Sequence, residues 1–195
     1  MPSVALACYA HGRPEQGFDY LKRQAVAARK AGSFHEYWTW EKYAGKTEPG
    51  GAPWYGETSA GFLDVLIHGL FGLSSPEPGF RSIRLAPQFP MEWKRAALEL
   101  RLPNGARLTV RYRAHNGESS LAVVCEAPVP ITVILPWHGP GTPVLTGRQL
   151  TGNQVEKTGK AVTVIAQMQG KGTIVMTPAP IRHPPVALAT VRQAR

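Results

Sequence analysis

Acidic and aromatic residues are concentrated in one short stretch of the chain, GSFHEYWTWEKYAGKTEPGGAPWYGE at residues 32–57. Cleavage of a glycosidic bond typically uses two carboxylates, of which one donates a proton and the other activates water or attacks the sugar. Trp and Tyr rings beside such carboxylates offer flat apolar faces on which a sugar can stack. The stretch therefore predicts one wall of a carbohydrate site, with four carboxylates to choose from: Glu36, Glu41, Glu48 and Glu57.

Each of these residues also has an ordinary structural explanation. Glu57 suits the positive end of a helix that starts beside it. His35 is equally explained by a hydrogen bond to a backbone carbonyl, and Glu48 by an exposed turn. Trp38 and Trp40 share one side of the chain if the segment is extended, and that side faces either a sugar or the core. Both explanations stay open at the level of sequence.

The residues before this stretch are predicted to form a helical hairpin. Its second helix starts at Pro14, which fits a first helical turn, and ends at Gly32, a common C-terminal stop. Residues 3–11 are typical of the last turns of the preceding helix. From the helical spacing of apolar residues, we expect the second helix to bury Phe18, Leu21, Ala25 and Ala28.

A third helix is predicted over residues 57–73, with Thr58 or Ser59 as its cap. Apolar residues occupy almost every side of this helix, and such a helix must be buried between partners. The hairpin and the β-region that follows offer it little cover. The sequence therefore suggests that further packing elements belong to the functional protein.

From residue 80 onward apolar and polar residues alternate, which is typical of β-strands with one buried face. Asn104-Gly105 and Asn116-Gly117 predict two tight hairpin turns. Further strands are expected at residues 131–136, 161–167 and 172–178. Together these signals predict about seven short antiparallel strands, the pattern of a β-sandwich. The predicted regions are helices and loop at 1–78, sandwich at 79–177 and a disordered tail at 178–195.

Three segments read together resemble a known group of enzymes. GSFHEYW at 32–38, residues 50–73, and PGFRSIRLAPQFPMEWKRAALELRL at 78–102 resemble the C-terminal end of bacterial six-hairpin glycosidases. This superfamily includes α-L-rhamnosidase-like, α-glucosidase-like and trehalase-like families, and disaccharide phosphorylases end similarly. The resemblance covers about residues 1–177. It implies an α+β chain in which a few helices from the end of an (α/α)6 barrel precede an antiparallel β-sandwich.

The resemblance also implies roles for individual residues. Glu36 matches the glutamate that often serves as general base in inverting members. It would deprotonate a water that attacks the anomeric carbon. The residues around it would then line a sugar subsite: Phe34, His35, Tyr37, Trp38 and Trp40, joined by Trp54 and Tyr55.

The chain also departs from the family pattern. A six-hairpin barrel needs two helices for each hairpin, and this sequence predicts about three helices in total. The general acid of the family lies in an earlier hairpin, whereas Glu15 and Asp19, the carboxylates upstream of Glu36, fall inside a predicted helix. We therefore expect a C-terminal fragment that is inactive alone. Its expected partners are a carbohydrate and either the missing N-terminal barrel portion or a second copy of the chain.

Three alternatives remain from the sequence: a carbohydrate-binding module without chemistry, a structural or assembly module, and a piece of a disaccharide phosphorylase. Trp93 is predicted to plug the interface between helices and sandwich. Trp137, at the start of a turn, is predicted to be exposed. Either residue could form part of a binding face on the β-region, although bracing is the favoured role for that region.

Composition and charge narrow the remaining function classes. The net charge of +9 is spread along the chain without a basic block, so nucleic-acid binding is not expected. No apolar run reaches membrane-spanning length. No signal peptide is evident, which leaves the compartment open with the cytoplasm slightly favoured. The histidines are scattered, so no metal or other cofactor is predicted, and Cys8 and Cys125 are expected to be reduced thiols.

Overall fold

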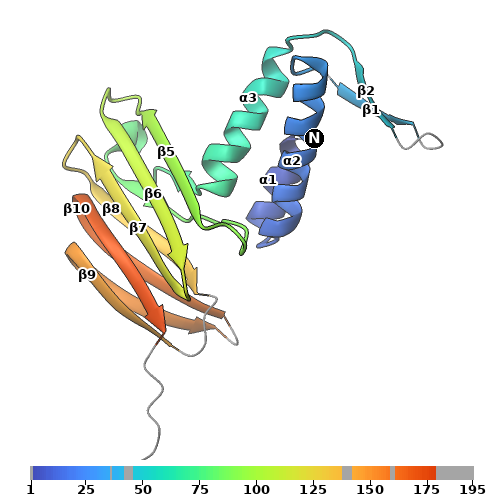
Figure 1. Ribbon diagram of the computed structural model, residues 1–195. Helices are drawn as coiled ribbons and strands as arrows, with labels where there is room; N and C mark the ends of the chain where they lie inside the picture. Colours follow the sequence, from blue (N-terminus) through green and yellow to red (C-terminus); the bar gives the residue numbers. More distant parts are fainter. Residues whose placement is uncertain (1, 36, 42–45, 138–141, 159–160, 179–195) are drawn as a thin grey trace, which may run out of the picture.

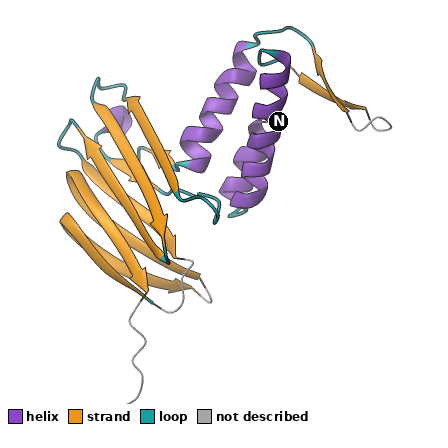
Figure 2. Ribbon diagram, viewed as in Figure 1, coloured by secondary structure: helices purple, strands orange, loops and turns teal. Residues whose placement is uncertain are grey.

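The structure, a computed structural model, describes residues 2–35, 37–41, 46–137, 142–158 and 161–178. A helical unit and a β-sheet unit lie side by side, and a small β-hairpin extends from the helical unit away from the sheet (Figure 1). Colouring by secondary structure shows the helices and the main sheet as separate bodies (Figure 2). One hydrophobic core nevertheless includes residues of both, from Leu21 and Val65 in the helices to Val133 and Ile174 in the sheet.

The predicted helical hairpin is confirmed as α1, Pro2–Ala10, and α2, Pro14–Ala31. Pro14 occupies the first turn of α2, and Gly32 ends the helix in the left-handed conformation with φ of 76°. Leu21 and Ala28 are buried as expected, but Ala25 is exposed and Gln24 is buried. The buried face is therefore rotated slightly from the face that the apolar spacing predicted.

The third helix, α3, spans Gly56–Asp64 and continues as a π-helix, η1, at Val65–Leu70. The predicted cap is wrong, because Tyr55 precedes the first turn and no side chain caps it. Thr58 is buried, and the Ser59 hydroxyl donates to the carbonyl oxygen of Gly56 at 2.9 Å. Val65 is 1% exposed, whereas Leu63 is 55% exposed. The described residues thus leave one apolar side of this helix uncovered.

Tyr9 is the residue around which the three helices pack. Its ring lies against two glycines, Gly17 of α2 and Gly69 of η1. A Cβ atom at Gly17 would lie 2.8 Å from the ring, and one at Gly69 would lie 2.6 Å from it. Both distances are shorter than a carbon–carbon contact allows, so an alanine at either glycine would displace the tyrosine.

The Tyr9 hydroxyl makes no hydrogen bond within the described part of the chain, although the residue is only 2% exposed. Burial raises the pKa of this phenol above its ordinary value, and the Glu15 carboxylate adds to the effect. A buried hydroxyl without a partner costs about 1–3 kcal/mol. The ring of Tyr9 therefore stabilises the fold by apolar packing, whereas its buried hydroxyl lowers the free energy of unfolding.

We expect Tyr9→Phe to leave the free energy of unfolding unchanged or to raise it by up to about 1 kcal/mol. In the wild type, an unfolded tyrosine ionises near pH 10 while the folded one stays protonated, so stability falls as pH rises above about 10. The variant should lose less stability over that interval. Urea titrations at neutral and alkaline pH measure both effects, and a clear destabilisation at neutral pH would contradict this assignment.

The β-unit is one hydrogen-bonded sheet of eight strands. Its path runs β3-β4-β8-β10-β7-β6-β5, and β9 pairs with β10 outside that path. The pairing of β4 with β8 is parallel, so the sheet is mixed. The strands are β3 (Leu73–Ser74), β4 (Ile83–Leu85), β5 (Arg95–Arg101), β6 (Arg107–His115), β7 (Glu118–Cys125), β8 (Pro130–Trp137), β9 (Pro143–Thr158) and β10 (Ala161–Pro178).

The two predicted hairpin turns are confirmed between β5, β6 and β7. Asn116 and Gly117 have φ of 48° and 79°, the positive values that a two-residue hairpin turn requires. Val110 and Leu121 are fully buried on the inner face of these strands, as the alternation of apolar residues predicts. Short-range turn chemistry therefore sets the register of this half of the sheet.

Strand β10 joins the two halves of the sheet. Its residues 162–169 pair with β8, and its residues 171–176 pair with β7. Gly170, with φ of 68°, lies between these two segments, and β9 follows β10 along both. Because β10 changes partner at the glycine, the sheet curls and its two halves enclose the core.

This architecture corrects the fold class predicted from the sequence. Within the described ranges the helices are α1, α2 and α3 with two short helical turns, η1 and η2 (Pro78–Phe80), and they form no (α/α)6 barrel. The β-unit is a curled mixed sheet and not a purely antiparallel sandwich. The parallel pairing arises because β4 meets β8, a strand remote in sequence. The predicted tail lies outside the described residues, except for Pro178 at the end of β10.

Residues 86–94, between β4 and β5, connect the helical unit to the sheet, and we call them the strap. Gln88 donates from Nε2 to the carbonyl oxygen of Tyr9 at 3.1 Å, and the Met91 amide donates to the Glu15 carboxylate at 3.2 Å. The Trp93 ring meets Phe18 of α2 edge-on at 5.0 Å. The predicted role of Trp93 at this interface is confirmed.

Candidate functional site

Three of the eight predicted sugar-site residues, Tyr37, Trp38 and Trp40, belong to a β-hairpin. Strand β1, Tyr37–Glu41, pairs antiparallel with β2, Lys46–Gly50, and Trp38 and Trp40 lie opposite Pro49 and Thr47. The sequence predicted an irregular loop here, so the hairpin is a correction. Glu36, the predicted general base, lies outside the described residues.

The segment that contains the hairpin is closed by a backbone hydrogen bond between its two ends. The Tyr55 amide, just before α3, donates to the carbonyl oxygen of Phe34 at 2.8 Å. The ring of Phe34 packs on Phe62 of α3 at a centroid distance of 5.1 Å. His35 is half-buried beside this contact. The structure thus brings Phe34, His35 and Tyr55 together at the place where the hairpin leaves the helical unit.

Trp54 stands out at the base of the hairpin because its side chain is 79% exposed. Its φ of 58° is unusual for a bulky residue and carries a backbone strain of about 1–3 kcal/mol. The neighbouring Tyr55 hydroxyl donates to the Glu57 carboxylate at 3.1 Å. Glu57 lies in the first turn of α3, where the helix dipole stabilises it. The exposed indole is available for stacking, whereas the Glu57 carboxylate is occupied by Tyr55.

The two carboxylates upstream of the hairpin have structural contacts. Asp19 forms an ion pair with Arg23 at 2.7 Å on the surface of α2, and Glu15 accepts from the strap amide of Met91. No group of three or more His, Cys, Asp or Glu among the described residues is arranged to hold a metal ion. No helix in the described part of the chain is long and apolar enough to cross a membrane.

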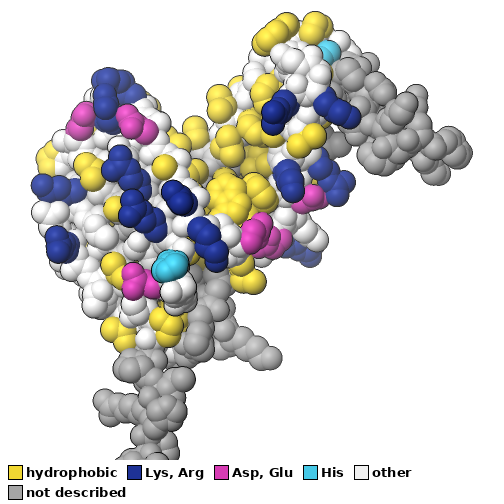
Figure 3. Space-filling model, in the orientation of Figure 1, with side chains coloured by type: hydrophobic (Ala, Val, Ile, Leu, Met, Phe, Trp, Pro, Cys, Tyr) yellow, Lys and Arg dark blue, Asp and Glu magenta, His cyan; other side chains and the backbone are white. Residues whose placement is uncertain are grey.

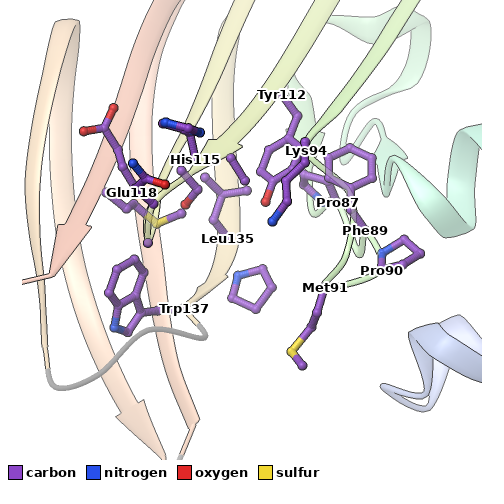
Figure 4. A pocket seen from close by; sticks show the side chains of 16 residues that line it. Pro87, Phe89, Pro90, Met91, Lys94, Tyr112, His115, Glu118, Leu135 and Trp137 are labelled. Carbon is purple, nitrogen blue, oxygen red and sulfur yellow. The ribbon is translucent and has the colours of Figure 1, made fainter.

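A second candidate site, which the sequence did not indicate, is a pocket of about 330 Å³ in the β-unit. It is bounded by the strap, by the β6–β7 turn and by the end of β8 (Figure 4). Leu135, Met176 and Trp137 are buried and form its apolar base. Trp137 was predicted to be exposed, but it is 8% exposed because it belongs to the last residues of β8 and faces inward.

Aromatic side chains form one wall of this pocket, and polar side chains lie at its mouth. The rings of Phe89 and Tyr112 are 4.7 Å apart. The Tyr112 phenol is protonated at neutral pH, as an ordinary tyrosine is, and can donate a hydrogen bond there. Burial raises its pKa further. Lys94 and Tyr112 lie on one side of the pocket, and His115 and Glu118 lie on the other (Figure 4). An apolar interior with a few polar groups at the mouth is the usual arrangement of a small-molecule site.

Comparisons with known proteins give a consistent result. Residues 72–146 match the family model described as the bacterial α-L-rhamnosidase C-terminal domain. This match covers β3 to the start of β9 and includes the strap. Of the families that the sequence motifs resemble, the rhamnosidases are therefore the one supported. No curated protein sequence matches the chain.

Two solved structures share the fold. The Streptomyces avermitilis α-L-rhamnosidase, complexed with L-rhamnose, aligns with a TM-score of 0.60 at 16% identity and covers 89% of this chain. The α-L-rhamnosidase from Dictyoglumus thermophilum has a TM-score of 0.60 at 16% identity and covers 88% of this chain. The chain spans only 17% and 20% of the lengths of these two proteins. At such identity the likeness establishes a shared fold.

Proposed function

We propose that the chain is the C-terminal part of a glycoside hydrolase of the α-L-rhamnosidase type. The observation that carries the proposal is the match of residues 72–146 to the rhamnosidase family model, and the fold likeness extends over 89% of the chain. The likeness therefore includes helical residues as well as the sheet. In this proposal the β-unit braces the enzyme, and the β1–β2 hairpin contributes one wall of its sugar site.

Glu36 is the proposed general base of the reaction. It removes a proton from a water molecule as that water attacks the anomeric carbon, which inverts the configuration there. The general acid lies elsewhere in the enzyme, about 6.5–9.5 Å from Glu36 so that the water fits between the two carboxyl groups. The structural contacts of Glu15 and Asp19 support this division, because both carboxylates are already engaged. The chain alone is then expected to be inactive.

The helical unit supports the proposal that other parts of an enzyme cover it. Val26 is 54% exposed and Leu63 is 55% exposed, and Val4 is 44% exposed on the neighbouring helix. Hydrophobic side chains also gather on the helical unit and beside the sheet on the face drawn in Figure 3. Burial of such side chains stabilises association by about 25 cal/mol per Å² of apolar surface. We propose that the remainder of the enzyme buries these side chains, with a second copy of the chain as the alternative.

A chimera tests this function directly. The chain would replace the matching segment of the Streptomyces avermitilis α-L-rhamnosidase, and hydrolysis of an aryl α-L-rhamnoside would be measured. We expect measurable turnover in the chimera and none with the isolated chain. The parent enzyme and a version lacking the whole segment serve as controls. A soluble, folded chimera without activity would overturn the proposal.

Trp38→Ala in the same chimera is expected to raise KM about tenfold, because a lost stacking surface costs about 1.4 kcal/mol of substrate binding. The kcat should change little, since stacking contributes equally to the bound substrate and to the transition state. Tyr20→Ala is the matched control, because Tyr20 is a partly exposed aromatic residue on α2, outside the hairpin. Equal KM values for wild type and Trp38→Ala would remove Trp38 from the sugar subsite.

A further inference from the structure

We infer that the pocket beside the strap binds a single neutral monosaccharide unit, independently of the β1–β2 hairpin. This strap pocket lies in the β-unit and shares no lining residue with the predicted sugar site. The inference goes beyond the proposed function, because it assigns a second carbohydrate site to the unit that otherwise only braces the enzyme.

The size of the strap pocket sets the size of its ligand. Its volume of about 330 Å³ is at the lower end of the range of about 300–1,000 Å³ for ligand sites. Such a volume takes one sugar ring and a few waters, and an oligosaccharide would have to extend out through the mouth. The ligand is therefore one terminal or free monosaccharide.

The chemistry of the lining selects an amphipathic ring. The buried side chains of Leu135, Met176 and Trp137 favour apolar C–H groups, and the protonated Tyr112 hydroxyl supplies a donor inside the pocket. Sugar rings combine C–H faces with hydroxyl groups, and aromatic side chains with one polar atom match that combination. A fully apolar ligand would form no hydrogen bonds with the polar side chains at the mouth. An ion would be buried against an apolar base, which costs free energy of desolvation.

The groups at the mouth favour a neutral ligand. Lys94 donates and Glu118 accepts, and both side chains are exposed. Neither forms an ion pair with any residue that the structure describes. Sugar hydroxyls both donate and accept, so different hydroxyls of one ring can use the lysine and the carboxylate. Lys94 and Glu118 carry opposite charges, so this pair at the mouth does not select a charged ligand.

The strap holds one wall of the pocket in place. Its hydrogen bonds to Tyr9 and Glu15 fix it to the helices, and the Ala114 amide donates to the carbonyl oxygen of Lys94 at 2.9 Å. The pocket wall is thus anchored to both units before any ligand arrives. A wall that is already in place lowers the cost of ordering the site when a ligand binds.

The experiment is a titration of the isolated full chain with neutral sugars, L-rhamnose, D-glucose and D-galactose, and with D-glucuronate for comparison. Amide and indole signals are followed by NMR, with the Trp137 indole as the reporter inside the pocket. We expect saturable shifts at Trp137 for at least one neutral sugar, with a Kd on the order of 1 mM. We expect weaker binding of D-glucuronate.

Two variants give the proposal its specificity. Ala114→Leu adds apolar bulk to a half-buried lining position and should abolish binding without altering any charge. Glu118→Gln removes the acceptor charge at the exposed mouth and should weaken binding at least fivefold. Arg101→Ala, an exposed strand residue that does not line the pocket, is the control. Near-UV circular dichroism checks that each variant keeps its fold.

Either of two results of the wild-type titration would overturn the inference: no saturable shift at Trp137 for any neutral sugar up to about 50 mM, or shifts confined to residues 34–55. Unchanged binding by a folded Ala114→Leu variant would do the same. The chimera's hydrolytic activity is measured separately, so failure of the strap pocket leaves the proposed function intact. Failure of the chimera likewise leaves the titration interpretable.

Discussion

Glu36→Gln is expected to lower the kcat of the rhamnosidase chimera by about 10²–10⁴-fold, the usual contribution of a general base. Glutamine keeps the size and hydrogen-bonding reach of glutamate but cannot accept the proton of the attacking water. Substrate binding should be nearly unchanged, because the loss concerns an interaction made in the transition state. Hydrolysis of an aryl α-L-rhamnoside under saturating substrate measures the effect.

Glu57→Gln is the matched control for this prediction. Glu57 belongs to the same acidic stretch, but it accepts a hydrogen bond from Tyr55 and lies in the first turn of α3. Its replacement should cost a little stability and leave kcat within about a factor of two to three, as for a surface change. An equal loss of kcat in both variants would assign the effect to the local fold. Full activity of Glu36→Gln would remove Glu36 from the reaction.

Gly72→Ala is expected to destabilise the protein by at least about 3 kcal/mol, a large share of a typical total of about 5–15 kcal/mol. Gly72 connects η1 to β3, and its carbonyl oxygen accepts from the Ala86 amide at 3.0 Å. A Cβ atom at Gly72 would lie 2.1 Å from the carbonyl oxygen of Ala86. The contact is with backbone, which cannot rotate away, so the helical unit and the strap would have to separate.

Gly79→Ala isolates the steric part of this effect. Gly79 has φ of 73°, close to the 58° of Gly72, but no atom lies within 4 Å of the Cβ position at Gly79. The control therefore carries the conformational strain of about 1 kcal/mol without the collision. Urea denaturation compares the two variants through their midpoints, provided that the slopes agree. Similar midpoints for both would show that the backbones at the junction can move apart.

Local signals in the sequence were enough for the helices and the tight turns. Pro14 and Gly32 mark the ends of α2, and the two Asn-Gly pairs mark hairpin turns, because a residue's own backbone preferences decide these features. The exposed Ala25 and buried Gln24 were not predictable, since the exact buried face depends on which helix packs opposite.

Features that depend on distant strands were missed. Strand β9 was not predicted, because it has few apolar residues and its pairing with β10 does not need them. Strand β10 was predicted as two strands, because its two apolar runs are separated by QGKG at 169–172. The chain continues through Gly170 because β9 runs alongside both segments. The β1–β2 hairpin was likewise hidden by its Gly and Pro content, including Pro49 in a strand with a single partner.

The two candidate sites differ in how much of each can be inferred from the sequence alone. The hairpin site remains a prediction from the sequence, where its acids and aromatics are neighbours in the chain. The strap pocket was not predictable, because its lining comes from residues 87–94, 112–119, 135–137 and 176, which only the folded sheet brings together. Two sides of the strap pocket do have signals in the sequence: the Pro-rich strap and the Asn116-Gly117 turn.

The shared strand β10 has a consequence for the order in which the protein matures during synthesis. Every strand from β3 to β8 reaches the other half of the sheet only through β10, whose last paired residue with β7 is Met176. A nascent chain that has emerged only as far as β8 therefore has two incomplete half-sheets with exposed inner faces. Such non-local pairing is slow and leaves strand edges open to wrong partners. The β-unit of this protein is thus expected to close after translation of β10, and to need protection from aggregation on the ribosome until then.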